Sequence, residues 1–159
     1  MFWNAQKRGK DVEAHLDQCN VPTEKETEMF CDFVETYEYQ GKARAVHSIS
    51  LSCHPIEYQK KIAKQLKKLD VGVIVCPSAA LSMTQQSTYM TPIHNSIAPV
   101  SLLVSEGVKV GLGVDNVEDI FMPFSDGNLM IEMRMLSESV RMYDEIDLLK
   151  IAENRMGFD

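Results

Sequence analysis

Two histidines and an aspartate at the ends of apolar runs are the residues of this sequence best suited to chemistry. His15 closes the first run with Asp17 just beyond it, His47 lies near the end of the second, and Asp115 with Asn116 closes the last. Two neutral imidazoles and a carboxylate suit a divalent cation such as zinc or iron, which lowers the pKa of a bound water toward neutrality. Asp115 could then take up the proton of that water, and His47 could stabilise charge developing on a substrate.

Each of these residues also has a simpler explanation. A single histidine at a strand end is more often structural than a ligand, and aspartate followed by asparagine is common in turns and helix caps. The occurrence of such residues at three of four predicted strand ends is harder to attribute to chance. The pattern alone leaves both interpretations open.

The elements that must position these side chains follow a regular alternation. Strands are predicted at 11–15, 43–49, 71–77 and 108–116. The run "VGVIVCP" is too apolar for a one-sided sheet and is typical of a strand covered on both faces. The two glycines of "VKVGLGVDN" indicate close backbone packing or a nearby ligand.

A helix is predicted after each of these strands. Thr23 and Glu26 form a capping-box pattern at the start of the first helix, Pro55 suits the first turn of the second, Gly107 closes the third, and Asp144 restarts helix in the C-terminal region. The polar stretch 78–95 is predicted as a long loop. The predicted apolar stripe of the first helix comprises Met29, Phe30, Phe33, Val34 and Tyr37.

Strand-helix units in series predict an α/β fold with a parallel sheet and right-handed crossovers. No low-complexity linker divides residues 1–159, so a single domain is expected. In βα architectures the carboxyl ends of the strands converge on one face, where barrel enzymes build their sites. His15, His47 and Asp115 are therefore expected to lie close together.

Composition excludes several classes of function. The net charge of -7 and the absence of a basic stripe argue against nucleic-acid binding. The lysines of 60–68 fall on the solvent side of a helical pattern, and no apolar stretch approaches the roughly 20 residues of a membrane span. The four cysteines lack C-x-x-C spacing, which favours reduced thiols and a cytoplasmic location.

Other catalytic patterns are missing from the sequence. Zinc-dependent cytidine-type deaminases need H-x-E and a later P-C-x-x-C, and "VCPS" does not supply the latter. A phosphate-binding turn would need a third glycine in "GLGVDN", and no G-x-S-x-G nucleophile elbow occurs.

Four segments of the chain resemble the cytosine deaminase branch of the amidohydrolase superfamily. They are "HLDQCNVPTEKETEMF", "RAVHSISLSCHP", "VGVIVCPSAAL" and "GLGVDNVEDIFMPFSDGNLM". Members of this family are (β/α)8 barrels of the TIM type. They hydrolyse C–N bonds in cyclic amidines, amides or amino-substituted heterocycles, so the resemblance implies a metal-dependent hydrolase acting on a small molecule.

The resemblance also implies roles for particular residues. His15 matches the metal-ligand histidine of the fifth barrel strand, His47 the sixth-strand histidine, and Asp115 the eighth-strand aspartate that binds the metal and shuttles a proton. Asn116 would face the substrate. His94, in "TPIHNS", would lie in a loop over the pocket as a candidate substrate contact.

The sequence departs from the family pattern at two positions of the site. Gln18 stands where cytosine deaminases carry a glutamate that protonates the ring, and an amide cannot donate a proton in the same way. Asn116 stands where the bacterial cytosine deaminases carry aspartate. Both departures point to a substrate other than cytosine, with Gln18 as a hydrogen-bonding group.

The His-x-His pair of the family's first strand is also missing. The match corresponds to about four βα units, the C-terminal half of a barrel with an incomplete set of metal ligands. Such a half would dimerise or pair with an N-terminal half. The alternative is a non-catalytic fragment or interaction domain that keeps the family sequence without a complete metal site.

Overall fold

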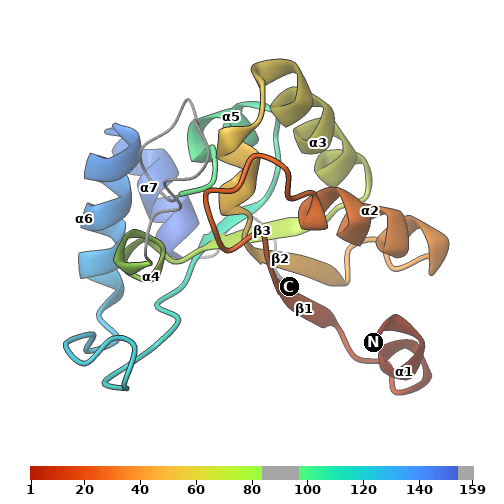
Figure 1. The fold of residues 1–159 in the computed structure, drawn as a ribbon, viewed down its shortest axis with the longest axis horizontal. Coiled ribbons are helices and arrows are strands. Elements are labelled where there is room, and N and C mark those ends of the chain that lie inside the picture. The colour runs from red at the N-terminus through yellow and green to blue at the C-terminus, as the bar shows by residue number, and fades with distance from the viewer. Residues whose placement is uncertain (84–96, 154–159) are drawn as a thin grey trace.

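The computed structural model describes residues 1–83 and 97–153, where helices alternate with strands (Figure 1). The elements are α1 (Phe2–Lys7), β1 (Val12–Leu16), α2 (Glu26–Thr36), β2 (Ala43–His47), the 3-10 helix η1 (Ile49–Cys53), α3 (Ile56–Lys68), β3 (Gly72–Val75), α4 (Pro77–Ser82), α5 (Val100–Ser105), β4 (Val110–Leu112), α6 (Leu129–Val140) and α7 (Glu145–Ala152).

The four strands form one parallel sheet in the order β1-β2-β3-β4, which confirms the predicted α/β architecture. Strands adjacent in sequence are therefore adjacent in space, and a helix lies in each crossover between them. The register sets Leu16 opposite His47 and Val75 opposite Leu112. All carboxyl ends of the strands consequently lie at one edge of the sheet.

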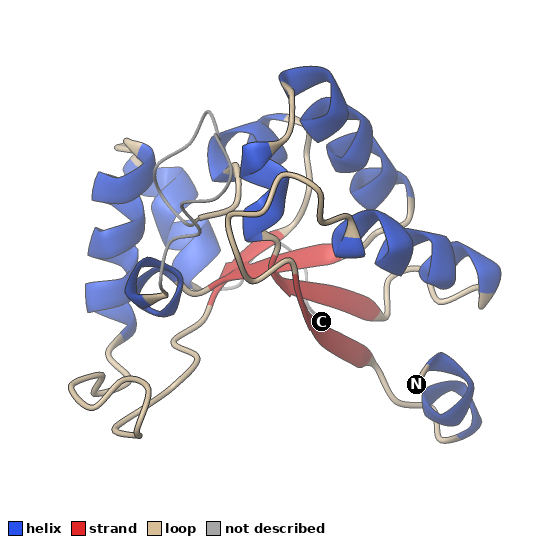
Figure 2. Ribbon diagram, viewed as in Figure 1, coloured by secondary structure: helices blue, strands red, loops and turns tan. Residues whose placement is uncertain are grey.

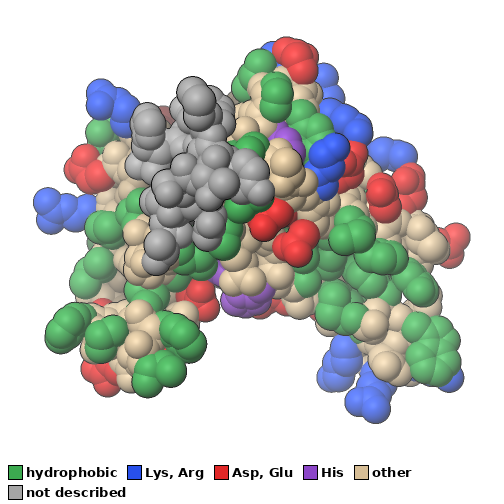
Figure 3. Space-filling view, in the orientation of Figure 1, with side chains coloured by type: hydrophobic (Ala, Val, Ile, Leu, Met, Phe, Trp, Pro, Cys, Tyr) green, Lys and Arg blue, Asp and Glu red, His purple; other side chains and the backbone are tan. Residues whose placement is uncertain are grey.

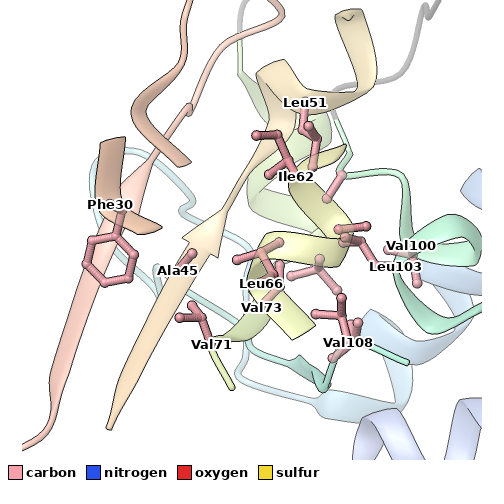
Figure 4. Close-up of a cluster of buried hydrophobic side chains, with 14 of the residues drawn as sticks. Phe30, Ala45, Leu51, Ile62, Leu66, Val71, Val73, Val100, Leu103 and Val108 are labelled. Atoms are coloured by element: carbon pink, nitrogen blue, oxygen red, sulfur yellow. The ribbon is translucent and has the colours of Figure 1, made fainter. Parts of the chain in front are cut away.

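The core lies between the sheet and the helices, which pack mainly over one of its faces (Figure 2). Ala45 of β2 and Val73 of β3 point toward this layer, where they meet Ile62 and Leu66 of α3 (Figure 4). All four side chains are inaccessible to solvent. Burial of each large aliphatic side chain contributes roughly 1.5–3 kcal/mol, so this layer supplies most of the stability.

Helix α3 confirms the predicted division between apolar and basic faces. Ile62 and Leu66 are buried, whereas the side chains of Lys61 and Lys68 are exposed and pair with Glu28 and Glu35 of α2. Exposed ion pairs of this kind contribute little to stability. The lysine cluster is a solvated helix face that bridges to its neighbour.

The predicted start of α2 is wrong. The helix begins at Glu26, and Lys25 at its cap position provides no side-chain hydrogen bond, so the capping box proposed at Thr23 does not form. The free N–H groups of Glu26 and Thr27 donate instead to the carboxylate of Asp17, at 2.9 and 3.0 Å. This cap comes from the end of β1, and a local sequence pattern does not reveal such a tertiary contact.

The predicted apolar stripe of α2 is also only partly correct. Phe30 and Val34 are buried, but Met29, Phe33 and Tyr37 are 53%, 46% and 37% exposed. The rings of Phe33 and Tyr37 contact Phe2 of α1, with centroid distances of 6.3 and 5.7 Å. These two residues hold α1 against α2 rather than α2 against the sheet. The residues of α2 that are buried are Thr27, Phe30, Cys31 and Val34.

The segment predicted as a loop at 78–95 begins with helix α4, so that prediction is wrong at its start. Pro77 occupies the first helical turn, where its missing N–H costs nothing. Residues 84–96, His94 among them, lie outside the described residues. The predicted restart at Asp144 is confirmed, because its carboxylate accepts a hydrogen bond from Asp147 N and caps α7. No helix of the described residues is long and apolar enough to cross a bilayer.

Gly113 shows why glycine follows β4 directly. A Cβ atom at this position would lie 3.0 Å from Cys76 Sγ and 3.1 Å from Ile74 Cγ2. The chain leaving β4 thus runs against β3 with no room for a side chain. This close approach confirms the packing predicted for "GLGVDN" and sets the path of the backbone toward Asp115.

We expect Gly113→Ala to lower the free energy of unfolding by about 1–3 kcal/mol, because the new methyl group overpacks the contact with β3. Urea denaturation followed by circular dichroism measures this loss. In the Gly113→Ala/Cys76→Ala double variant the sulfur is gone, and a double-mutant cycle should show a favourable coupling. Additive effects of the two substitutions would contradict the proposed contact.

Candidate metal centre

Three strand ends bring His15, His47 and Asp115 together. His15 is the fourth residue of β1, His47 is the last residue of β2, and Asp115 follows β4 after two intervening residues. In a flat sheet β2 and β4 would lie about 10 Å apart, because neighbouring strands are separated by about 4.8 Å. Curvature of the sheet and the turn after β4 close that gap, as in a barrel wall.

The backbone turns sharply where these side chains gather. His47 has φ +76°, Ser48 φ +52° and Asp115 φ +67°, all in the left-handed region that residues other than glycine rarely adopt. Each such conformation costs of order 1–3 kcal/mol and persists only where surrounding contacts hold it. Local strain therefore aims the side chains of β2 and of the segment after β4 into a common space.

The donor atoms of the three side chains lie within 4.8 Å of one another. His15 Nδ1 is 3.1 Å from His47 Nε2, which in turn is 3.4 Å from Asp115 Oδ2. Two ligands of a tetrahedral ion bound at about 2.0–2.1 Å are separated by about 3.3 Å, so both distances fit a shared cation. The set also leaves one coordination position without a ligand from these residues, as catalytic zinc sites do.

Burial keeps His47 neutral. Its side chain is fully inaccessible, and desolvation lowers its pKa, against the opposing effect of the Asp115 carboxylate and with a smaller lowering by His15. Within the described residues, His47 Nδ1 is buried without a hydrogen-bond partner. An imidazolium would need acceptors for both N–H groups, and the environment supplies none at Nδ1. The neutral ring, with one lone pair, is the form that binds a cation.

A cavity of about 430 Å³ opens beside these donors and is lined by His15, Gln18, Asp115 and Asn116. Four of the residues singled out in the sequence thus share one cavity. His47 lies behind them, covered from solvent. The remaining wall comes from α4 and the loop after β4, namely Ala79, Ser82, Met83, Phe121 and Met122.

Asp119, which the sequence did not single out, bonds to Asn116 and to the backbone of the loop that lines this cavity. Its carboxylate accepts hydrogen bonds from Asn116 Nδ2 and from the backbone N–H groups of Phe121 and Met122, the latter two at 2.9 and 2.8 Å. These bonds, led by that of Met122, lower the pKa of Asp119. Asp119 orients the amide of Asn116 and folds the loop into the cavity wall. The signal was an aspartate three residues after Asn116, a spacing typical of turns.

Asp17, named beside His15 in the sequence, takes no part in the donor set. Its side chain is 2% exposed and its carboxylate is used by the N-terminus of α2. His94 lies outside the described residues, so its predicted place over the pocket remains a prediction. The structure brings together His15, Gln18, His47, Asp115 and Asn116.

No model of a known protein family matches the chain. An uncharacterised protein of Haemophilus influenzae is 32% identical over 102 residues, which cover 64% of this chain and 37% of the relative. The chain therefore spans little more than a third of the length of that relative.

Solved structures with the same fold cover nearly the whole chain. The 5-methylcytosine deaminase of Klebsiella pneumoniae, solved with 5-fluorocytosine and with phosphonocytosine, matches with a TM-score of 0.86 at 20% identity, over 96% of this chain and 38% of the deaminase. The N-isopropylammelide isopropylaminohydrolase of Burkholderia multivorans matches with a TM-score of 0.73 at 15% identity, over 99% and 36%. The chain has the fold of part of an amidohydrolase-type TIM barrel, as the sequence predicted.

The lowered pKa of His47 predicts how stability depends on pH. Below about pH 6.5, the ordinary pKa of histidine, the unfolded chain takes up a proton that the native state does not, so stability falls as pH falls until the native ring also titrates. The slope attributable to this ring reaches at most about 1.4 kcal/mol per pH unit. Urea denaturation of the wild type and of His47→Gln between about pH 7.5 and 5 measures it, with a chelator present. Equal slopes in the two proteins would contradict the assignment.

Proposed function

We propose that this chain is the C-terminal half of a metal-dependent hydrolase that cleaves C–N bonds in a cyclic amidine, amide or amino-substituted heterocycle. The observation that carries the proposal is the spacing of the three donor atoms of His15, His47 and Asp115, at 3.1 and 3.4 Å in succession. The solved structures of the same fold are enzymes that act on such rings by name, which supports the class of reaction.

The donor set suits zinc or iron. Imidazole nitrogen is a good ligand for both metals, and one carboxylate completes a mixed nitrogen and oxygen site of the kind found in hydrolytic centres. The neutral state of buried His47 removes the need to displace a proton before binding. The side chain of Asp115 is 18% exposed, lies 3.4 Å from His47 Nε2 and also lines the cavity.

The bound cation would polarise the substrate and make a water acidic enough to attack at neutral pH. Asp115 would accept the proton of the attacking water and return it to the leaving nitrogen, since its carboxylate lines the cavity where both would lie. His47, whose Nε2 would bind the cation and whose ring does not line the cavity, would stabilise developing charge only by holding that cation.

The cavity would select a neutral polar ring. Gln18 and Asn116 both line it, and an amide offers a donor and an acceptor but no proton to transfer. One N–H of the Asn116 amide donates to Asp119, so its second N–H and its oxygen are the groups left to pair with polar atoms of a ring. His94 remains a proposed substrate contact. Asp115 would be the only proton shuttle.

The rest of the barrel would come from an N-terminal half or from a second copy of the chain. Within the described sheet, β1 and β4 each have one neighbour, and unpaired edges favour pairing with further strands. Ile120, Phe121 and Phe124 in the loop after β4 are 90%, 74% and 98% exposed, and hydrophobic side chains gather over this loop at the lower left of Figure 3. Such a surface suits contact with the missing units.

We place the protein in the cytoplasm as part of this proposal. The four cysteines, all in the described part of the chain, form no disulfide, and burial raises the pKa of Cys31 and of Cys76 to about 12. Thiols with raised pKa values are inert, as structural cysteines of reducing compartments are.

Zinc binding tests the site. We expect the metal-free chain to bind close to one Zn²⁺ in isothermal titration calorimetry, and Asp115→Ala to weaken binding by more than the roughly 10–100-fold lost when a supporting residue is removed. Asp147→Ala is the matched control, because this acidic residue lies on α7 away from the donors. Equal affinities of the wild type and Asp115→Ala would contradict the site.

Ammonia release from amino-substituted rings tests the reaction. In a form that also contains the remaining barrel units, with zinc bound, Asp115→Asn keeps the size of the side chain but loses the base, and we expect it to lower the hydrolysis rate by about 10²–10⁴-fold. The substrates to screen are pyrimidines and triazines, the ring classes of the enzymes with the same fold. Zinc bound at the site without hydrolysis of any ring would favour the non-catalytic alternative.

A further inference from the structure

We propose that Asp17 is the positioning residue of this centre. It does not touch the donor atoms but ties together the two chain segments that carry His15 and His47. The inference rests on the proposed function, because it assigns Asp17 an effect on metal affinity. Beyond that function, we assign to buried Asp17 the role of setting the spacing between His15 and His47.

The carboxylate of Asp17 has a complete set of hydrogen-bond donors. Oδ1 accepts from Glu26 N at 2.9 Å, and Oδ2 accepts from Thr27 N at 3.0 Å and from Thr27 Oγ1 at 2.6 Å. The residue is 2% exposed. A charged group this deeply buried is stable only when its oxygens are satisfied, and the free N–H groups and dipole of the α2 N-terminus provide that.

The same hydroxyl extends the contact toward His47. Thr27 Oγ1 lies 3.1 Å from Ser48 Oγ, the side chain that follows His47 directly. The single proton of Thr27 goes to the carboxylate, so Ser48 donates to Thr27. A short chain of bonds therefore joins Asp17, two residues after His15, to the residue beside His47.

The backbone of Asp17 makes a second connection between the same segments. Its carbonyl oxygen accepts from Ile49 N at 2.8 Å and from Ser50 N at 3.2 Å, and its N–H donates to Glu26 Oε2 at 2.6 Å. Asp17 itself has φ +50°, a conformation that needs such support. The end of β1 and the turn after β2 are thus locked to each other and to α2.

The negative charge matters more than the shape of the side chain. In Asp17→Asn an NH₂ group replaces one carboxylate oxygen. This group would face either the N–H of Glu26 or the N–H and hydroxyl of Thr27, and because it is itself a donor it could not accept their hydrogen bonds. Asparagine tolerates a positive φ, so the backbone conformation itself remains available. The substitution therefore loosens the lock without imposing backbone strain.

The test compares two helix caps. Asp144 caps α7 through one bond to Asp147 N, 3.0 Å long, and lies outside the cavity lining and the donor set. In the full chain, we expect Asp17→Asn to weaken Zn²⁺ binding by about 10–100-fold in competition with a chromophoric chelator, the range found for groups that orient metal ligands. We expect Asp144→Asn to change it less than twofold. Equal Zn²⁺ affinity in wild type and Asp17→Asn would overturn the proposal.

A second variant covers the case in which Asp17→Asn does not fold. Thr27→Val keeps the side-chain shape and removes the hydroxyl between Asp17 and Ser48, and we expect a smaller loss of Zn²⁺ affinity with an altered visible spectrum of the Co²⁺ form. A folded Thr27→Val protein with wild-type affinity and spectrum would equally overturn the proposal. Failure of the proposed function itself is a different result: Asp115→Ala would then leave Zn²⁺ binding unchanged.

Discussion

The turn of the backbone at His47 brings the first two donor side chains together, because the parallel register of β1 and β2 pairs His15 with Val46 and Leu16 with His47. Side chains alternate between the two faces of a sheet, so the register alone would direct His15 and His47 to opposite faces. The φ of +76° at His47 turns its ring so that Nε2 lies 3.1 Å from His15 Nδ1. The third donor depends on curvature, because Asp115 follows β4, two strands away from β2 in the sheet. Left-handed backbone at His47 and at Asp115 therefore directs both side chains into the space beside His15.

Burial then decides the chemical state of the centre. His47 is removed from water at the end of β2, so its ring is held neutral, while His15 and Asp115 remain open to the cavity. Among the residues that the structure describes, none accepts a hydrogen bond from Nδ1 of His47, so they do not satisfy a charged imidazole. With a neutral His47 ring and donors held by a strained backbone, the site has little to reorganise when a cation binds, which is the condition for a defined coordination geometry.

The sequence predicted the parts of this structure that depend on local patterns. Apolar β-branched runs identified the strands, and their alternation with helices identified the parallel sheet, because each of these signals is written within about 15 residues. The convergence of His15, His47 and Asp115 followed from the parallel arrangement. The family resemblance added the barrel, which the solved structures of the same fold confirm.

What the sequence missed depends on contacts between distant segments. Asp17 appeared to be one more polar residue at a strand end, yet it caps a helix that begins nine residues later and replaces the cap predicted at Thr23. Asp119 organises the loop that carries Phe121 and Met122, and α4, with only six residues, is too short to show a helical period in the sequence. These features depend on the contacts that form in the folded chain, and the periodicity of apolar residues in the sequence does not reveal such contacts.

The most direct measurement of the central claim is an anomalous difference map at the zinc edge from a crystal of the chain grown with Zn²⁺. We expect one dominant peak about 2.0–2.2 Å from His15 Nδ1, His47 Nε2 and Asp115 Oδ2, the bond lengths of zinc to nitrogen and oxygen ligands. A map with zinc only on surface carboxylates, and none between these three side chains, would contradict it.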